Sequence, residues 1–167
     1  MSTPVVKNFM KQQGFPDEGA ELCNMHFAGL YFQPRIVFPL VLVGIAFQSA
    51  TFFFLLSALL WWNTLLPALN PFEWVYNLAI AASRGTPPLA TAPGPRRFAQ
   101  GMAAAFLLGA GLALRAGRPE LSWLLQGLLV IAFLALLFGR FCLGAYVYHV
   151  LRGRLAFANS TLPWVRG

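Results

Sequence analysis

Electric charge is the scarcest property of this 167-residue sequence. Only 10% of the residues are charged and 58% are hydrophobic, whereas an average soluble domain has about 25% charged residues. The chain runs from Ile36 to Phe72 without a charge, and two more apolar stretches follow, Phe98 to Leu114 and Leu121 to Gly139. Because an ion at the centre of a bilayer helix costs ~2.5 to 3.5 kcal/mol, such runs are typical of membrane-spanning helices. The sequence predicts an integral membrane protein covered by lipid.

Cysteines and acids are also few, and each shortage excludes a class of protein. Two cysteines cannot form a disulfide framework. The acids closest to the apolar stretches, Glu73 and Glu120, fall outside them, which argues against a chain of buried acids for protons or ions. The sequence shows no cofactor fingerprint and no complete catalytic or metal set, so we expect no cofactor and lean against an enzyme.

The positive charge is distributed as the flanks of membrane segments are. The net charge of +7 comes from 12 Lys and Arg residues that are scattered beside apolar stretches. Because no single basic stripe gathers them, we expect no nucleic-acid partner, and the lipid bilayer is the expected partner. The residues that we assign to membrane flanks are Arg35, Arg96, Arg97, Arg140, Arg152 and Arg154.

The number of spans depends on the first apolar run. As one helix, Ile36 to Leu69 would be about 51 Å long, against a hydrocarbon core of about 30 Å. Either this helix ends near the Trp61-Trp62 pair, or the polar residues Gln48 to Thr51 turn it into a hairpin. The hairpin leaves only Arg115 and Arg118 opposite the other Lys and Arg residues. Since positive charge favours the cytoplasmic side, we favour four spans with both termini cytoplasmic, and three spans are the alternative.

We predict an all-α, polytopic membrane helix bundle with interfacial helices. An N-terminal cytoplasmic or interfacial segment, 1–34, precedes the bundle, 35–151, and a short basic tail, 152–167, follows. In the N-terminal segment, a helix start at Phe15-Pro16-Asp17-Glu18 and apolar residues up to Tyr31 indicate a surface-lying segment. Glu73 to Ser83 is expected to rest at the interface. The proline-rich loop 84–98 is expected to be stiff, extended and without packed structure.

Small residues recur every four positions in the span that begins near Arg97. They are Gly101, Ala105, Gly109, Ala113 and Gly117. Such a stripe lets helices approach closely in lipid. The contact can be made with a second copy of the chain or with a neighbouring helix of the same chain, and we favour the latter.

The last apolar block, Leu121 to Leu151, is interrupted by Arg140. Its first 19 residues measure about 28 Å, enough to cross, so Arg140 is expected at the exit. A continuing helical end with Phe141, Tyr146, Tyr148 and His149 is expected in the headgroup layer.

Several motifs in this order resemble the bacterial membrane family catalogued as domain of unknown function 4395. They are Asn70-Pro71-Phe72, Pro95-Arg96-Arg97-Phe98-Ala99 and Phe138-Gly139-Arg140-Phe141-Cys142-Leu143-Gly144, and the resemblance covers about Arg35 to Leu151. Many members of that family end the last helix with Cys-x-Gly-Cys, which implies thiol chemistry near the membrane surface. This chain keeps Cys142 and Gly144 but has Ala145 in place of the second cysteine, so the resemblance implies no dithiol activity here.

Two ligand sites are conceivable from the sequence, and each has a plainer interpretation. Cys23, Met25 and His26 offer an incomplete set for a soft metal ion, and we favour an ordinary interfacial segment with no metal. His26 and His149 could bind a haem, but both lie outside the apolar runs. The polar residues in or beside the spans are expected to form hydrogen bonds between helices: Gln48, Asn63, Gln100 and Gln126.

Three functions remain open from the sequence. The first is a small protein of the bacterial inner membrane without a catalytic site, acting as a homo-oligomer or as an accessory subunit of a larger membrane complex. The second is a membrane thiol-redox or electron-transfer component using Cys142. The third is an oligomeric channel or transporter, because Gln, Ser and Thr can line a pore.

Overall fold

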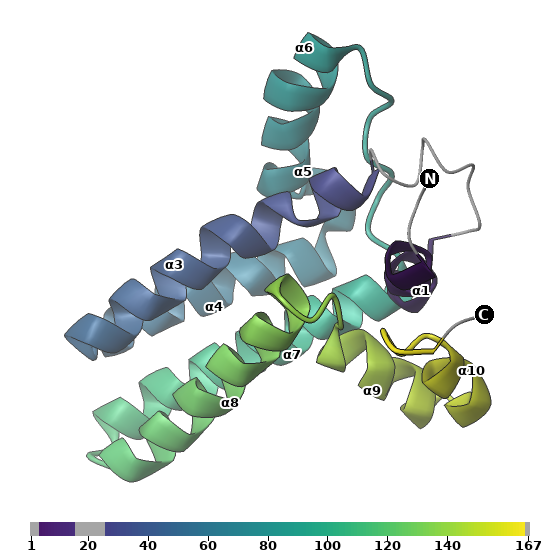
Figure 1. Ribbon diagram of the computed structural model, residues 1–167. Coiled ribbons are helices and arrows are strands. Elements are labelled where there is room, and N and C mark those ends of the chain that lie inside the picture. The colour runs from purple at the N-terminus through teal and green to yellow at the C-terminus, as the bar shows by residue number, and fades with distance from the viewer. Residues whose placement is uncertain (1–3, 16–25, 166–167) are drawn as a thin grey trace.

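The computed structural model describes residues 4–15 and 26–165, except the side chain of Arg84, and its helices are joined by short connections (Figure 1). The longest are a helix from His26 to Phe47, whose second part is α3 (Phe32–Phe47), then α4 (Ala50–Leu65), α7 (Gly94–Arg115) and α8 (Pro119–Leu137). By length and apolarity, three of these can cross a membrane, and α4 is a shorter apolar helix. The predicted helical membrane bundle is confirmed.

The long charge-free run is a hairpin of two helices. Gln48 adopts a left-handed backbone conformation, φ 45°, and its side-chain amide donates to the carbonyl oxygen of Ile45 at 2.8 Å. The hydroxyl of Ser49 accepts a hydrogen bond from the backbone N–H of Phe52 at 3.3 Å and so caps α4. These two residues end one helix and start the next, so Trp61 and Trp62 lie near the end of the second helix.

Two such hairpins form the bundle. Helix α3 packs on α4 and α8, and α7 packs on α4 and α8, which closes a ring of four helices. The turn between α7 and α8 uses Gly117 with φ 67°. Both turns lie at one end of the bundle, whereas α1 (Pro4–Gln13), α9 (Leu143–Leu151), α10 (Leu155–Ser160) and both termini lie at the other (Figure 1).

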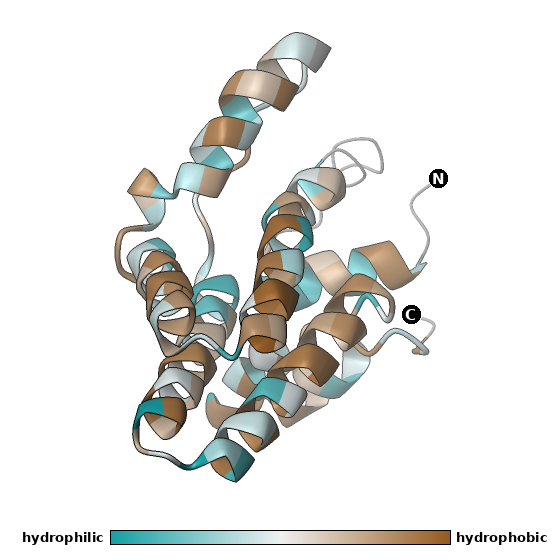
Figure 2. Cartoon of the chain, turned by 90° about the vertical axis from the view of Figure 1, so that its left-hand side faces the viewer, coloured by the Kyte–Doolittle hydropathy of each residue, from teal (hydrophilic) through white to brown (hydrophobic). Residues whose placement is uncertain are grey.

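The distribution of polarity fits a lipid environment. Large apolar side chains such as Phe47, Leu55 and Ile131 are exposed on the outside, and apolar residues cover much of the long helices (Figure 2). Polar groups lie inside: the Ser57 hydroxyl donates to the carbonyl of Ala104 at 2.8 Å, and the Ser122 hydroxyl donates to that of Ala110 at 2.9 Å. Because lipid cannot satisfy polar groups, helices in membranes pair them with one another.

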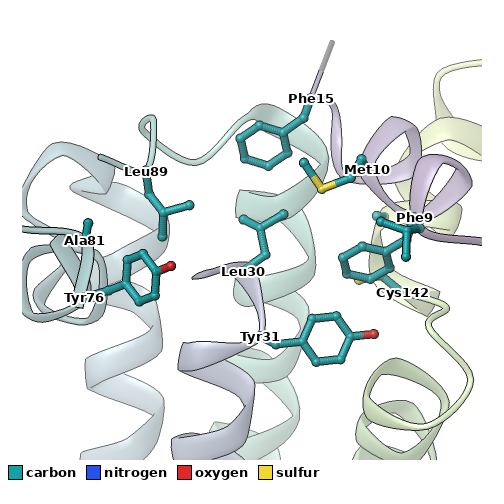
Figure 3. Packing of buried hydrophobic residues seen from close by; sticks show 11 residues of the cluster. Phe9, Met10, Phe15, Leu30, Tyr31, Tyr76, Ala81, Leu89 and Cys142 are labelled. Atoms are coloured by element: carbon teal, nitrogen blue, oxygen red, sulfur yellow. The ribbon is translucent and has the colours of Figure 1, made fainter. Parts of the chain in front are cut away.

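A cluster of buried residues lies at the end of the bundle next to α1 and α9 (Figure 3). Leu30 and Tyr31 pack there with Phe9 and Met10 of α1 and with Cys142. Leu30 and Tyr31 are thus buried among other parts of the chain, and their helix continues directly into α3. The predicted helix start at 15–18 falls mostly outside the described residues.

The region between the hairpins departs in part from expectation. After the short helix η1 (Pro67–Leu69), α5 (Pro71–Tyr76), a π-helical turn η2 (Asn77–Ala81) and α6 (Ala82–Arg84) form one helical arm that extends away from the bundle (Figure 1). Residues 86–93 are irregular, and α7 begins at Gly94. The loop is nevertheless packed, contrary to prediction: Leu89 is buried, and its backbone N–H donates to the side-chain oxygen of Asn77 at 2.8 Å.

The last apolar block also breaks more sharply than expected. Helix α8 ends at Leu137, and the next helix, α9, begins only at Leu143. Between them Arg140 has φ 51°, a conformation that does not continue a right-handed helix. Phe141 therefore lies in the break, and only Tyr146, Tyr148 and His149 lie on the following helix.

Candidate functional site

An apolar cavity of about 210 Å³ lies within the bundle, at the end next to α1 and α9. Its walls come from all four long helices and are made mainly of aliphatic and aromatic side chains, among them Val37, Leu60, Ala103, Phe106, Leu129, Ala132 and Phe133. Its polar lining residues are few: Gln13, Gln33, Arg96, Gln100 and Cys142. Apolar walls with a small number of polar groups are the usual composition of a small-molecule site.

Cys142 reaches the cavity because the break after α8 is held on two sides. Its backbone N–H donates to the side-chain oxygen of Gln12 on α1 at 2.8 Å. Two residues later, Gly144 lies so close to α7 that a Cβ atom there would stand 2.6 Å from the Cα of Ala99. Only glycine permits this approach without a backbone shift. Together these contacts place the thiol at the start of α9, where it is the N-cap residue.

The thiol of Cys142 is acted on by opposing effects. Burial raises the pKa of Cys142, because the thiolate loses its hydration. Hydrogen bonding by the backbone of Ala145, the side chain of Gln13 and the backbone of Gly144, followed by the positive charge of Arg96, lowers it by less. The net pKa is raised, so the thiol is neutral near pH 7 and is not primed as a nucleophile.

A buried ion pair stands beside the thiol. Arg96, in the first turn of α7, is 6% exposed, and its guanidinium lies 3.7 Å from the carboxylate of Glu73 on α5. Burial raises the pKa of Glu73, while Arg96 and a hydrogen bond from Asn70 lower it by less. The positive charge of Arg96 lies in the first turn of α7, where a cation interacts unfavourably with the helix dipole. Glu73 supplies the opposite charge, so the guanidinium of Arg96 is not buried alone.

Gln33 and Gln100 form an amide pair between α3 and α7. The Gln100 Nε2 donates to the Gln33 Oε1 at 2.8 Å. Gln100 is 8% exposed, and its Oε1 has no hydrogen-bond partner among the described residues. An unsatisfied buried polar atom costs about 1–3 kcal/mol, and this oxygen is enclosed by the surrounding side chains.

The five small residues of α7 have different surroundings. Gly101 faces Thr64 and Trp61 of α4, whereas Gly109 faces Leu125 of α8. Ala113 is buried, Ala105 is exposed, and Gly117 lies in the turn after the helix. The reason is geometric, since four residues advance an α-helix by about 400° and the stripe drifts by about 40° at each step. The five therefore do not share one neighbour.

The arginines assigned to membrane flanks also differ. Arg96 is buried in the ion pair, and Arg97 donates from Nε to the carbonyl of Thr64 at 2.9 Å. Three others lie over aromatic rings, with guanidinium carbons at 5.2–5.7 Å from the ring centroids: Arg35 over Tyr31, Arg140 over Phe27, and Arg152 over Tyr148. Arg154 is exposed after α9.

The other candidate ligands are placed apart from this cavity or outside the described residues. Cys23 and Met25 fall outside, and within the described ranges no three of His, Cys, Asp and Glu come together as a metal site. His149 is buried, and its Nε2 lies 3.0 Å from the carbonyl oxygen of Gln12. Gln48 and Gln126 exchange two hydrogen bonds, 2.9 and 3.2 Å, at the hairpin end. Asn63 is fully buried.

Sequence reasoning missed part of the polar end of the cavity. The sequence predicts Arg96 as a membrane-flank residue. Its buried partner Glu73 lies on another helix, and nothing in the sequence connects the two residues. Gln13 and Gln33 were not singled out, because isolated glutamines carry no pattern. Gln100 is a polar residue in an apolar span, and that contrast is the usable signal in the sequence.

Comparison with known proteins gives a family without a described activity. The chain matches no curated protein and no solved structure. Residues 28–153, which span α3 to α9, match the family described as Domain of unknown function (DUF4395). The chain belongs to this family.

Proposed function

We propose that this protein is a non-catalytic membrane protein that binds an amphipathic molecule from the lipid phase. The observation that carries the proposal is the cavity of about 210 Å³, with apolar walls from the spanning helices and polar residues at one end. A lipid-soluble molecule can enter a cavity with such walls from the bilayer without losing a hydration shell. The polar residues at one end of the cavity would fix the orientation of the molecule.

The size of the cavity limits its occupant. An engineered apolar cavity of about 150 Å³ holds one benzene molecule. A cavity of about 210 Å³ therefore accommodates one ring or a short length of one hydrocarbon chain, and a whole two-chain phospholipid does not fit. A single-chain amphiphile is the proposed ligand.

We further propose that the protein lies in the plasma membrane with both termini in the cytoplasm. The support is the distribution of positive charge in the sequence. The α3–α4 turn and the α7–α8 turn lie at one end of the bundle, and the basic residues of the sequence next to these turns are Arg115 and Arg118. Positively charged residues favour the cytoplasmic side. The polar end of the cavity then opens toward the cytoplasmic half of the bilayer.

One observation favours a second function, thiol chemistry at Cys142. The thiol lines the cavity, and the backbone groups of Gly144 and Ala145 and the side chain of Gln13 are placed to stabilise a thiolate. Its raised pKa opposes this function. We therefore rank it second.

A pair of variants on α7 tests ligand binding. Ala103 lines the cavity, whereas Ala105, two residues later, is exposed on the outside of the bundle. Ala103→Phe should fill the cavity and abolish labelling by a photoreactive single-chain alkyl probe, while Ala105→Phe should leave labelling at cavity residues unchanged. Labelling would be mapped by mass spectrometry of the purified protein. Equal labelling of cavity peptides in both variants would refute the proposal.

A further inference from the structure

A second and wider hollow lies beside the start of α7, between α1, α9 and α10, at the end of the bundle where these short helices gather (Figure 1). Its volume is about 680 Å³, and none of its lining residues belongs to the apolar cavity. Two of its lining residues are basic, Lys11 on α1 and Arg154 directly before α10, and none of its described lining residues is acidic. The lining of this hollow is therefore positively charged.

Arg154 supplies a charged donor to the hollow. Its side chain is exposed, and its guanidinium has no ion-pair partner in the part of the chain that the structure describes. Gly153, with φ 70°, turns the chain between α9 and α10 directly before Arg154. Because a guanidinium carries five N–H donors in a planar fork, it can bind two phosphate oxygens at once.

The phenol of Tyr148 supplies a second donor. Its ring packs near Phe98, at a centroid distance of 5.7 Å, and the guanidinium carbon of Arg152 lies 5.2 Å from its centroid. A Cβ atom at Gly94 would stand 3.0 Å from the hydroxyl oxygen, so the hydroxyl lies at the first turn of α7. Within the described residues this hydroxyl has no hydrogen-bond partner, and the side chain is only half-buried. The hydroxyl is therefore available to a ligand in the hollow.

The start of α7 adds backbone donors. This helix of 22 residues begins at Gly94, and no side chain caps it. Pro93, Gly94 and Pro95 all line the hollow. The first N–H groups of a helix have no acceptor within the helix, and the positive end of the helix dipole favours an anion there. Since proline has no N–H, Gly94 and Arg96 carry the donors of this turn.

A ligand that suits this hollow is an anion with several acceptor atoms, because the side chains and backbone groups described above are donors. We propose that the hollow binds a phosphate group, with Arg154, Tyr148 and the start of α7 as its donors. This site is independent of the ligand proposed for the apolar cavity. The phosphate can belong to a membrane lipid or to a solute.

The surroundings of the hollow favour a lipid as the source of the phosphate. Large apolar side chains are exposed beside Arg154, at Leu151, Leu155 and Phe157. Apolar side chains of this kind insert among lipid chains, while neighbouring basic residues are attracted to anionic head groups. A phospholipid head group in the hollow would leave its acyl chains next to these apolar residues.

Binding of matched lipids to the purified wild-type protein tests the site. Short-chain phosphatidylglycerol and phosphatidylcholine of equal chain length would be titrated into the protein in a neutral detergent, and native mass spectrometry would count the bound molecules. Phosphatidylglycerol should bind more tightly, because the choline of phosphatidylcholine would place a cation beside Arg154. Calorimetry of the lipid-free protein with inorganic phosphate tests a solute as the source.

Three variants assign the binding to the hollow. Arg154→Gln should weaken phosphatidylglycerol binding about fivefold, the effect of one basic residue beside an anionic lipid surface. Tyr148→Phe keeps the ring and should weaken binding about threefold, as expected for one hydrogen bond. Arg118→Gln removes the same charge from the exposed turn between α7 and α8, at the other end of the bundle, and should bind like the wild type. The melting temperature of each variant checks its folding.

The outcomes distinguish a built site from general attraction to positive charge. Weaker phosphatidylglycerol binding in Arg154→Gln and Tyr148→Phe, with wild-type binding in Arg118→Gln, would support a lipid phosphate. Binding of inorganic phosphate that depends on Arg154 and Tyr148 would support the same site with a solute as its ligand. Equal losses in Arg154→Gln and Arg118→Gln would overturn the site, and so would wild-type binding of both ligands in Arg154→Gln and Tyr148→Phe.

Discussion

Cys142 shows how burial and hydrogen bonding compete at a single residue. Its thiol meets N–H groups at the start of α9 and lies near Arg96, yet burial outweighs them and raises its pKa. Arg140 is only two residues from this cysteine in the sequence, whereas the cation that acts on the thiol is Arg96, which is far away in the sequence. The chemistry of the thiol therefore depends on tertiary packing.

The first prediction concerns the reaction of Cys142 with a membrane-permeant alkylating reagent. Because the thiolate is the reactive species, the rate at pH 7 should be well below that of the denatured protein, and it should rise steeply with pH above 9. Arg96→Gln should lower the rate further, since Arg96 lowers the pKa of the thiol. Mass spectrometry at several pH values measures the rate. Rapid labelling of the folded protein at pH 7 would raise the thiol function to first rank.

The second prediction concerns the pH dependence of stability at Glu73. Burial raises its pKa above the ordinary 4.5, so the folded protein holds this proton more tightly than the unfolded chain does. The stabilisation is present below pH 4.5 and is lost as the pH rises through the raised pKa. In the Glu73→Gln variant the side chain at this position does not titrate. The melting temperature of the wild type, relative to this variant, should therefore fall as the pH rises to 8.

The exposed Glu120 at the start of α8 provides the control. Glu120→Gln should leave the wild-type pH dependence largely unchanged, because an exposed carboxylate keeps its hydration in both states. A wild-type advantage over Glu73→Gln that grew with pH would mean that attraction to Arg96 outweighs the cost of burial.

At the scale of elements, α7 is the central helix of the bundle, against which several other helices pack. It contacts α4, α8, α9 and α1, and its small residues face different neighbours. Gly109 approaches Leu125 of α8, where a Cβ atom would stand 3.0 Å from the Leu125 Cδ1. Ala105, one turn earlier, is exposed. Gly109 is therefore a position that tests packing within the chain, and Ala105 is a position that tests packing between copies of the chain.

The third prediction uses these two positions. Gly109→Leu should push α8 away and destabilise the protein by about 1–3 kcal/mol, the usual cost of overpacking. Ala105→Leu should leave the melting temperature unchanged, because its side chain points out of the bundle. Thermal denaturation in detergent and the assembly size by light scattering measure both effects. A change of assembly size in Ala105→Leu alone would assign a contact between copies to this face of α7.

The helices and turns that can be predicted are those with a signal in the local sequence. The turn at Gln48 and Ser49 was foreseeable as one of two alternatives, because polar residues interrupt an apolar run and the run is too long for one span. The burial of Leu89 was not foreseeable, because it depends on Asn77 binding the loop backbone. Likewise, the cavity requires α3, α7 and α8 to be placed together, and its glutamines form no sequence pattern.

At the scale of the whole molecule, the two hairpins place both turns at one end and both termini at the other (Figure 1). Helix α4 has 16 residues, which corresponds to about 24 Å and is less than the ~30 Å of a bilayer core. A short helix can still cross where the bilayer thins or flanking residues extend to the interface. The hairpin geometry favours crossing, because α4 lies beside α7 within the same bundle.

The last prediction is that the two turns face the same side of the membrane and that the termini face the other. In a background of Cys23→Ser and Cys142→Ser, an impermeant maleimide applied to intact cells should label Ser49→Cys and Gly117→Cys. It should label Trp164→Cys, near the C-terminal end, only after permeabilisation. These results follow if four helices cross, since each crossing reverses the side. If α4 did not cross, the turn at Ser49 and the C-terminal end would share a side, and labelling of both Ser49→Cys and Trp164→Cys in intact cells would establish three spans.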